Sequence, residues 1–277
     1  MLAIAVPAGL LIGLSLGALG GGGSILTVPV LVYLLHQAPH AATTGSLLIV
    51  GITAAGGMIA HRRAGRVRLA PGITFGALGV AGSYAGTRLS SSIRPDLLLS
   101  LFAGLMLVAA AAMLRRRRGT ASQHARAAEN RPAAARAPAR PRAWQRPGTT
   151  APVRQGLKII AAATGVGLLT GFFGVGGGFV IVPALVLALG FDMPAAVGTS
   201  LLVIAINSTT ALAARLGSHT SLDWPLLGVF TVAALAGALA GNRVASRVDA
   251  SRLTAAFTVL LVAVAAYSLV RSLPRLV

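Results

Sequence analysis

Two glycine-rich interruptions inside apolar sequence are the features of this chain that could bind a ligand. The first covers Gly20–Ser24 and is followed by Pro29; the second covers Gly174–Gly178 and is followed by Pro183. Consecutive glycines cost about 1 kcal/mol each in a helix interior relative to alanine, so each interruption predicts a broken helix. The freed backbone N–H groups, together with the positive dipole end of the next helix, favour an anion.

A hydroxyl cluster follows each interruption. The first reads Ala-Thr-Thr-Gly-Ser-Leu at 42–47 and the second reads Ala-Val-Gly-Thr-Ser-Leu at 196–201. These hydroxyls can donate to an anion's oxygens, or they can cap the backbone at a helix start. Farther along, Asn207 is unusually polar for an apolar helix, and Thr53 occupies the matching place in the first half. Interhelical hydrogen bonding is the alternative role for this pair.

The candidate substrate-binding residues are therefore backbone, hydroxyl and amide groups from both halves. They are Gly20, Gly21, Gly22, Gly23, Ser24, Thr44, Ser46, Gly174, Gly176, Gly177, Gly178, Thr199, Ser200 and Asn207, with Pro29 and Pro183 as structural residues of the helix breaks.

The number and positions of the acidic residues argue against a cation site or a proton relay built on buried carboxylates. There are only five, and all fall in loops, segment ends or the central linker: Asp96, Glu129, Asp192, Asp223 and Asp249. A buried carboxylate for a cation site or a proton relay is therefore not expected. The chain has no cysteine, and neither glycine run has the features of a nucleotide-binding loop. We expect no catalytic residues, no metal site and no cofactor; His36 and His40 read as an interfacial loop rather than a metal site.

The composition predicts a polytopic membrane protein. Hydrophobic residues make up 55% of the 277 residues and charged residues 10%, with a mean hydropathy of +0.80. Most of the net charge of +19 lies in a central stretch and in the loop at 62–68. Because these basic runs adjoin apolar segments, the positive-inside rule explains them better than nucleic-acid binding does. The first apolar segment lacks a basic start and is expected to be a retained helix.

Apolar segments are predicted at 2–20, 24–36, 41–60, 69–90 and 96–114, and again at 157–173, 177–190, 195–214, 225–241 and 253–271. Between the two sets, residues 115–156 are rich in arginine, proline and alanine, which is typical of a disordered linker. The chain is thus divided into a first transmembrane repeat at 1–114, a cytoplasmic linker at 115–156 and a second repeat at 157–277.

The two apolar regions are one unit repeated. At a constant spacing, Gly13, Gly17 and Gly20 match Gly167, Gly171 and Gly174, as Ser46 matches Ser200. So many coincidences indicate an internal duplication. If all five segments of a half cross the membrane, the second half is inverted, as in many transporters. If the short segment is re-entrant, each half crosses four times and the repeats are parallel. The charges of the loops favour inversion.

These residues also resemble a known family. The blocks GGGGSILTVPVL at 20–31 and ATTGSL at 42–47, repeated as GFFGVGGGFVIVPAL at 171–185 and AVGTSLLVIAINS at 196–208, resemble the sulfite exporter TauE/SafE family of membrane permeases. The resemblance covers both apolar halves and leaves out the linker. It implies an inner-membrane carrier of small sulfur-containing anions such as sulfite or organosulfonates.

The sequence therefore predicts an all-α membrane protein of two homologous halves, with four or five transmembrane segments in each and eight to ten in all. We expect a secondary transporter that moves a small anion across the inner membrane by alternating access. An anion channel and a non-transporting assembly or sensor subunit are the alternatives. The expected partners of the protein are the small anion and the lipid bilayer, and no binding of nucleic acid is expected. The sequence does not predict an oligomeric state.

Overall fold

The computed structural model describes residues 2–90, 101, 104, 105, 107, 108, 111, 152–173, 178–215 and 222–272, and these are helical or form short connections. The described helices are α1 (Leu2–Leu19), α2 (Gly22–Pro29), the π-helical turn η1 (Val30–Leu34), α3 (Pro39–Arg63), α4 (Leu69–Ser90), α6 (Pro152–Phe173), α7 (Gly178–Ala188), α8 (Met193–Ala213), α9 (Trp224–Ala245) and α10 (Ala250–Ser272).

The predicted all-α class is confirmed over this part of the chain, and each predicted segment there coincides with a helix. The predicted segment at 96–114, apart from a few residues, and nearly all of the predicted linker lie outside the described residues. Helix α6 begins at Pro152, a few residues before the predicted start of the second repeat. Proline is well suited to a first helical position because its missing N–H would have no partner there.

The two prolines after the interruptions behave differently. Pro29 is the last residue of α2, after which the chain continues as the π-helical turn η1. Pro183 lies inside α7, and that helix continues to Ala188. Pro183 therefore lies inside the helix that begins at Gly178 and does not end it. A proline removes one hydrogen bond from the ladder, and neighbouring helices in a membrane protein can compensate for it without ending the helix.

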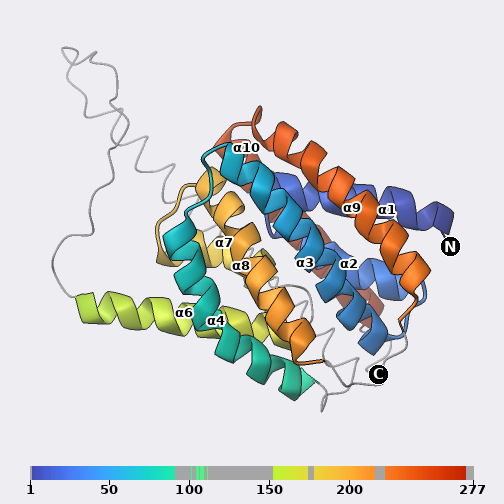
Figure 1. Ribbon diagram of the computed structural model, residues 1–277, viewed down its shortest axis with the longest axis horizontal. Helices are drawn as coiled ribbons and strands as arrows, with labels where there is room; N and C mark the ends of the chain where they lie inside the picture. Colours follow the sequence, from blue (N-terminus) through green and yellow to red (C-terminus); the bar gives the residue numbers. More distant parts are fainter. Residues whose placement is uncertain are drawn as a thin grey trace.

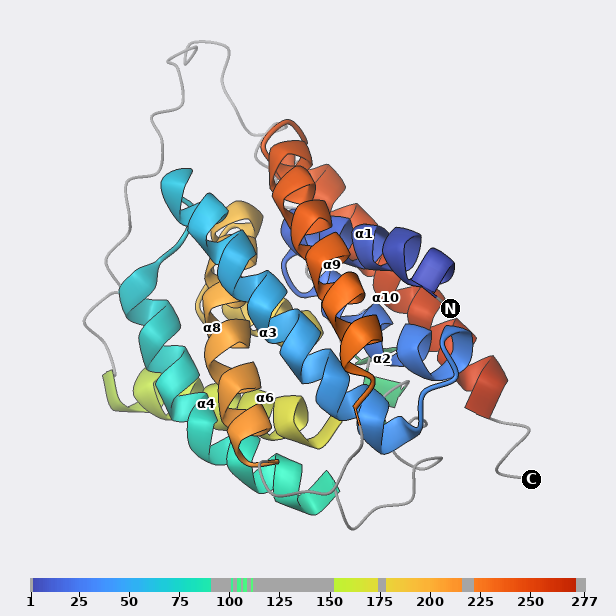
Figure 2. The same cartoon turned by 45° about the vertical axis from the view of Figure 1, so that its right-hand side comes forward.

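Four helices lie side by side in the order α4, α8, α3, α9 (Figure 1). Helix α6 runs along α4 at one end of this row, and α1 runs along α9 at the other end, as the turned view also shows (Figure 2). Helices α2 and α7 lie behind the row and contact each other. Each half of the chain therefore packs a helix along the outer helix of the other half.

Close glycine contacts fix the direction of the helices. On α3, Gly51 lies against Ser208 and Gly57 against Leu201, so α3 and α8 are antiparallel. A different set of contacts, Gly9 against Ala233 and Gly17 against Ala238, makes α1 and α9 parallel.

The pair α4 and α6 is also parallel. Gly79 approaches the carbonyl oxygen of Ala163, and Gly86 approaches Leu168 and Phe172. Thus the two outer pairs, α1 with α9 and α4 with α6, are built in the same way.

Glycines permit these pairs to approach closely. A β-carbon at Gly13 or Gly17 would collide with the backbone of α9, and one at Gly167 or Gly171 would collide with the backbone of α4. Small residues spaced four apart allow helices in a membrane to pack backbone against backbone. These four glycines therefore serve the close packing of α1 on α9 and of α6 on α4.

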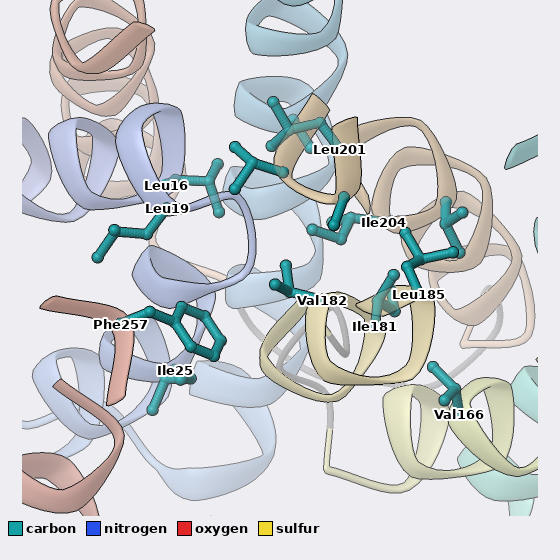
Figure 3. Packing of buried hydrophobic residues seen from close by; sticks show 14 of the residues in the cluster. Leu16, Leu19, Ile25, Val166, Ile181, Val182, Leu185, Leu201, Ile204 and Phe257 are labelled. Atoms are coloured by element: carbon teal, nitrogen blue, oxygen red, sulfur yellow. The ribbon is translucent and has the colours of Figure 1, made fainter. Parts of the chain in front are cut away.

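Three of the described helices are long and apolar enough to cross a membrane: α3, α8 and α9. Shorter apolar stretches are Ala3–Leu19, Gly22–Leu34, Ile159–Phe173 and Ser251–Ala266. Between the helices lies an apolar core in which Leu201 and Ile204 of α8 face Val182 of α7 (Figure 3). Large apolar side chains such as Leu11 and Val232 are exposed on the outside, as expected for a surface in contact with lipid.

Candidate functional site

The two glycine interruptions meet in the interior. Helix α1 ends at Leu19, and Gly20 adopts a φ of 70°, which favours glycine. Across from it, Gly178 begins α7, and a β-carbon at Gly178 would lie 2.5 Å from the α-carbon of Gly21 and 2.9 Å from Oγ of Ser24. The start of α7 therefore rests directly on the interruption between α1 and α2.

Helix α8 also packs against the interruption between α1 and α2. A β-carbon at Gly20 would lie 2.5 Å from Oγ of Ser200 and 3.0 Å from the α-carbon of Val197. Five candidate residues are thus brought together, and we call them the central cluster: Gly20, Gly21, Ser24, Gly178 and Ser200. Ser24 and Ser200 are fully buried.

The serine hydroxyls bond to their own helices in this conformation. Ser24 Oγ donates to the carbonyl oxygen of Gly21 at 2.7 Å, and Ser200 Oγ donates to that of Val197 at 2.8 Å. Ser46 Oγ, which is also fully buried, donates to the carbonyl oxygen of Thr43 at 2.9 Å. A hydroxyl can rotate to another acceptor, so these groups remain able to donate to an anion.

The remaining candidate glycines are divided between packing positions and positions outside the described residues. Gly22 lies against Leu19, and Gly23 packs on the backbone of α1 at Ile12 and Leu16. These two glycines let α2 fold back along α1. Gly174, Gly176 and Gly177 lie outside the described residues.

Asn207 faces α4 and α6 rather than the central cluster. Its side-chain amide is next to Gly79, where a β-carbon would lie 2.9 Å from Oδ1, and Gly79 also approaches the backbone of α6. The residue is fully buried, and neither Oδ1 nor Nδ2 has a hydrogen-bond partner among the residues that the structure describes. Thr53, its counterpart, likewise buries an Oγ1 without a partner there. Unsatisfied buried polar groups are costly and often have a functional reason.

Thr44 lies at one end of the α3–α8 crossing. Thr43 Oγ1 and Thr44 Oγ1 each donate to the carbonyl oxygen of His40 and accept from Nη1 of Arg215, at 2.7 Å and 3.0 Å respectively. Burial lowers the pKa of the Arg215 guanidinium to about 10, so it remains a cation at neutral pH. The chain just after α8 is therefore fastened to the first turns of α3.

Thr199 lies at the opposite end of the same crossing. Its Oγ1 accepts from the backbone N–H of Arg68 at 3.0 Å, and the adjacent Gly198 packs against the backbone of Arg66. The chain just after α3 is therefore fastened to the first turns of α8. Thr44 and Thr199 thus hold the two ends of the crossing, and the Thr199 side chain bonds to the loop after α3, whereas its neighbour Ser200 lies against Gly20 in the central cluster.

Two functional candidates were missed from the sequence: Arg215 and His61. His61 lies in the last turn of α3, and Arg215 follows the end of α8 at Ala213, in a loop that the sequence shows as nearly neutral. Only the packing shows that Arg215 reaches α3 and that His61, fully buried, bonds to the end of α1. In contrast, His36 and His40 are exposed.

Releasing Arg215 should expose the interior from one side. The chain has no cysteine, so Ser46→Cys introduces a single reporter thiol. Because hydrogen bonds to a charged group contribute about 1.5–3 kcal/mol, we expect Arg215→Ala to speed maleimide labelling of that thiol by roughly ten-fold or more. Labelling at Ser200→Cys, which lies near the other end, serves as the control and should change little. Equal labelling of Ser46→Cys with and without Arg215 would contradict the role of this contact.

The fold and the buried polar groups define a multi-pass membrane protein with an all-helical interior. The chain belongs to the sulfite exporter TauE/SafE family, whose model matches residues 5–268. It is 34% identical to a probable membrane transporter protein of Xylella fastidiosa over 281 aligned residues, which cover 100% of this chain and 98% of the relative. It is 28% identical to the probable membrane transporter protein YdhB of Bacillus subtilis over 245 residues, or 84% of this chain and 86% of the relative.

No solved structure matches the chain. The family and the relatives identify the protein as a membrane transporter, as the repeated glycine and hydroxyl blocks predicted. The expected sulfite exporter TauE/SafE resemblance is confirmed.

Proposed function

We propose that the protein is a secondary transporter that moves a small sulfur-containing anion, such as sulfite or an organosulfonate, by alternating access between two inverted halves. The observation that carries this proposal is the meeting of Gly20–Ser24 with Gly178 and Ser200, which joins equivalent parts of both halves. In transporters, interrupted helices from two repeats form the substrate site.

The directions of the helices support inversion. Helices α3 and α8 occupy equivalent positions in the two halves and run antiparallel, as Gly51 and Gly57 indicate. A symmetry axis along the membrane normal would make them parallel, whereas an axis in the membrane plane makes them antiparallel. The matching pairs α1–α9 and α4–α6, each parallel, agree with the second arrangement.

The groups around the centre favour an anion. Helices α1, α2, α3, α7 and α8 contain no aspartate or glutamate. They offer hydroxyls and the backbone of two helix interruptions at the central cluster, and the Asn207 amide on the side of α8 that faces α4 and α6; these groups can donate hydrogen bonds to anionic oxygens. A buried cation would lack counter-charges there.

Two contacts support alternating access. Arg215 fastens the end of α8 to Thr43 and Thr44, while Arg68 fastens the end of α3 to Thr199. Both contacts are formed in this structure, and Ser24, Ser46 and Ser200 are fully buried. A transporter that is closed on both sides of the membrane, in its occluded conformation, has these features. Opening one contact at a time would give access from one side at a time.

The sulfur-containing substrate rests on the family name alone. The proposed location is the inner membrane, with the linker at 115–156 on the cytoplasmic side, because that linker and the loop at 62–68 carry most of the arginines.

Binding of anions to the purified protein tests the proposal. A ligand of the folded protein raises its apparent melting temperature by mass action. We would compare sulfite, sulfate, thiosulfate, sulfoacetate, taurine and short carboxylates. Selective stabilisation by a sulfur oxyanion or sulfonate supports the substrate class, whereas stabilisation only by carboxylates or by cations overturns it.

Flux into vesicles then separates a carrier from a channel. A carrier exchanges labelled for unlabelled anion and saturates, whereas a channel supports no such counterflow. Ser200→Ala combined with Asn207→Ala should abolish exchange while the protein stays folded. Intact exchange in that variant would remove these residues from the site.

A further inference from the structure

His61 is a titratable side chain buried within the helical bundle and has no part in the site described above. It lies near the end of α3, is fully buried and bonds through Nε2 to the carbonyl oxygen of Gly17 at 2.8 Å. A carbonyl oxygen can only accept, so Nε2 must carry a proton. The second nitrogen, Nδ1, is therefore unprotonated in the neutral imidazole, and the imidazole becomes charged when Nδ1 binds a proton.

Nδ1 is buried without a hydrogen-bond partner among the described residues. On α9, Oδ1 of Asn242 is also buried without one there. The helices α3 and α9 run parallel in register, with Gly45 against Leu227 and Gly57 against Ala238. One further turn along both helices brings His61 level with Asn242.

The two unsatisfied atoms are complementary only when a proton is added. Neutral Nδ1 and the amide Oδ1 are both acceptors and cannot bond to each other. Protonated Nδ1 is a donor, and the amide oxygen of Asn242 is the acceptor at its level. Protonation of Nδ1 would thus replace two unsatisfied buried acceptors with one charge-assisted hydrogen bond.

The acceptor on Gly17 connects His61 to the central cluster. Gly17 lies in the last turn of α1, whose carbonyl groups form the negative end of the helix dipole and favour a cation. Gly20, which contacts Ser200, follows less than one turn later. One turn before His61, Gly57 packs on Leu201, next to Ser200. An anion at the cluster would therefore lie close to the imidazole and favour its charged form.

The other charged groups around His61 are basic or outside the bundle. Helices α1, α2 and α8 contain no titratable side chain, and η1 carries Tyr33. Arg62 and Arg63 follow on α3 and are exposed, as is Arg243 on α9. In the loop after α3, Arg66 lies near the imidazole, while Arg252 of α10 is exposed and pairs with Asp249. With no carboxylate facing it from these helices, the charge that offsets imidazolium is that of the substrate.

We propose that His61, with Asn242 as acceptor, binds a proton together with the substrate anion, so that the two are transported in the same direction. This inference rests on the proposed anion transport. One proton binds to Nδ1 from water for each anion bound and returns to water when the anion leaves. The linkage is reciprocal: the proton raises the affinity for the anion, and the anion raises that for the proton.

Thiosulfate is a suitable probe because it keeps its double negative charge throughout the useful pH range, whereas sulfite takes up a proton near neutral pH and could itself carry that proton across the membrane. The purified full chain is reconstituted into vesicles of phosphatidylethanolamine and phosphatidylglycerol that contain a trapped pH indicator. Entry of thiosulfate should acidify the interior. An inward proton gradient should drive its accumulation, by at most about ten-fold per pH unit for one proton per anion.

His61→Gln is the decisive variant because its amide N–H can keep the bond to Gly17 but cannot titrate near neutral pH. It should exchange thiosulfate without acidifying the vesicles and without pH-driven accumulation. His40→Gln, which replaces an exposed histidine, is the control and should behave as the wild type. Asn242→Leu removes the acceptor and should move the pH dependence of uptake to more acidic values, because the charged imidazole is then less stable.

The outcomes separate the two proposals. Thiosulfate flux by the wild type without proton movement, or proton movement that persists in His61→Gln, overturns the role of His61 and leaves anion transport intact. Absence of binding and flux for every anion of the panel overturns both. If His61→Gln does not fold, proton movement by the wild type and the pH dependence of uptake by Asn242→Leu still test the role of His61.

Discussion

Asn207→Leu is expected to make the protein more resistant to heat and unable to transport its anion. The Asn207 amide is fully buried and unpartnered among the described residues, and such a group costs about 1–3 kcal/mol relative to an apolar one of similar shape. Leucine fills nearly the same space beside Gly79 without that cost. The apparent melting temperature in detergent should therefore rise by a few degrees, while exchange in vesicles is lost.

Ser15→Ala is the matched control for this variant. Ser15 on α1 also buries a hydroxyl without a partner in the described part of the chain, but it is not a candidate for the site. Its replacement should raise or preserve stability and leave exchange unchanged. If Asn207→Leu lowers the melting temperature, the amide has a stabilising partner and is structural. If exchange survives, Asn207 is not needed for transport.

Gly178→Val is expected to separate the two interruptions and stop transport. A β-carbon there would lie 2.5 Å from the α-carbon of Gly21 and 2.6 Å from Cδ1 of Ile204. The first of these is backbone and cannot rotate away, so α7 must shift. Overpacking of this kind costs about 1–3 kcal/mol. The measurements are the melting temperature and exchange, and both should fall.

Gly228→Ala provides the comparison for the glycine itself. Gly228 lies in α9, and no atom within 4 Å would meet its β-carbon. Alanine there should be neutral or stabilise by up to about 1 kcal/mol, since it favours helix. Normal exchange in Gly178→Val would show that the contact between α7 and Gly21 is not needed for the transport cycle.

Much of the helical architecture could be predicted from the sequence because long apolar runs and glycine punctuation are local signals. The predicted segment at 69–90 matches α4, and the end of α1 at Leu19 follows from the glycines after it. Pro183 lies inside α7 without ending it, because a proline ends a helix only where the surrounding structure does not compensate for it.

The candidate site was harder to predict because its geometry depends on contacts between distant residues. The sequence placed Thr44 and Thr199 beside the serines, yet each accepts a hydrogen bond from an arginine of the other half, Thr44 from the Arg215 side chain and Thr199 from the Arg68 backbone. Which residue lies opposite which is a matter of helix register and crossing. Arg215 and His61 carried no local signal of their own, since histidine and arginine at the end of an apolar helix are common.

The exchange of outer helices has a consequence for how the chain is made. Because α1 packs along α9 and α6 along α4, the ribosome completes the first half long before its glycine faces have anything to pack against. The glycine faces of the first half therefore contact lipid until the second half has been inserted. The chain that connects the halves keeps the helices of the second half at a high effective concentration near the first. Neither half should assemble alone, but two fragments divided within the linker and produced together should recombine.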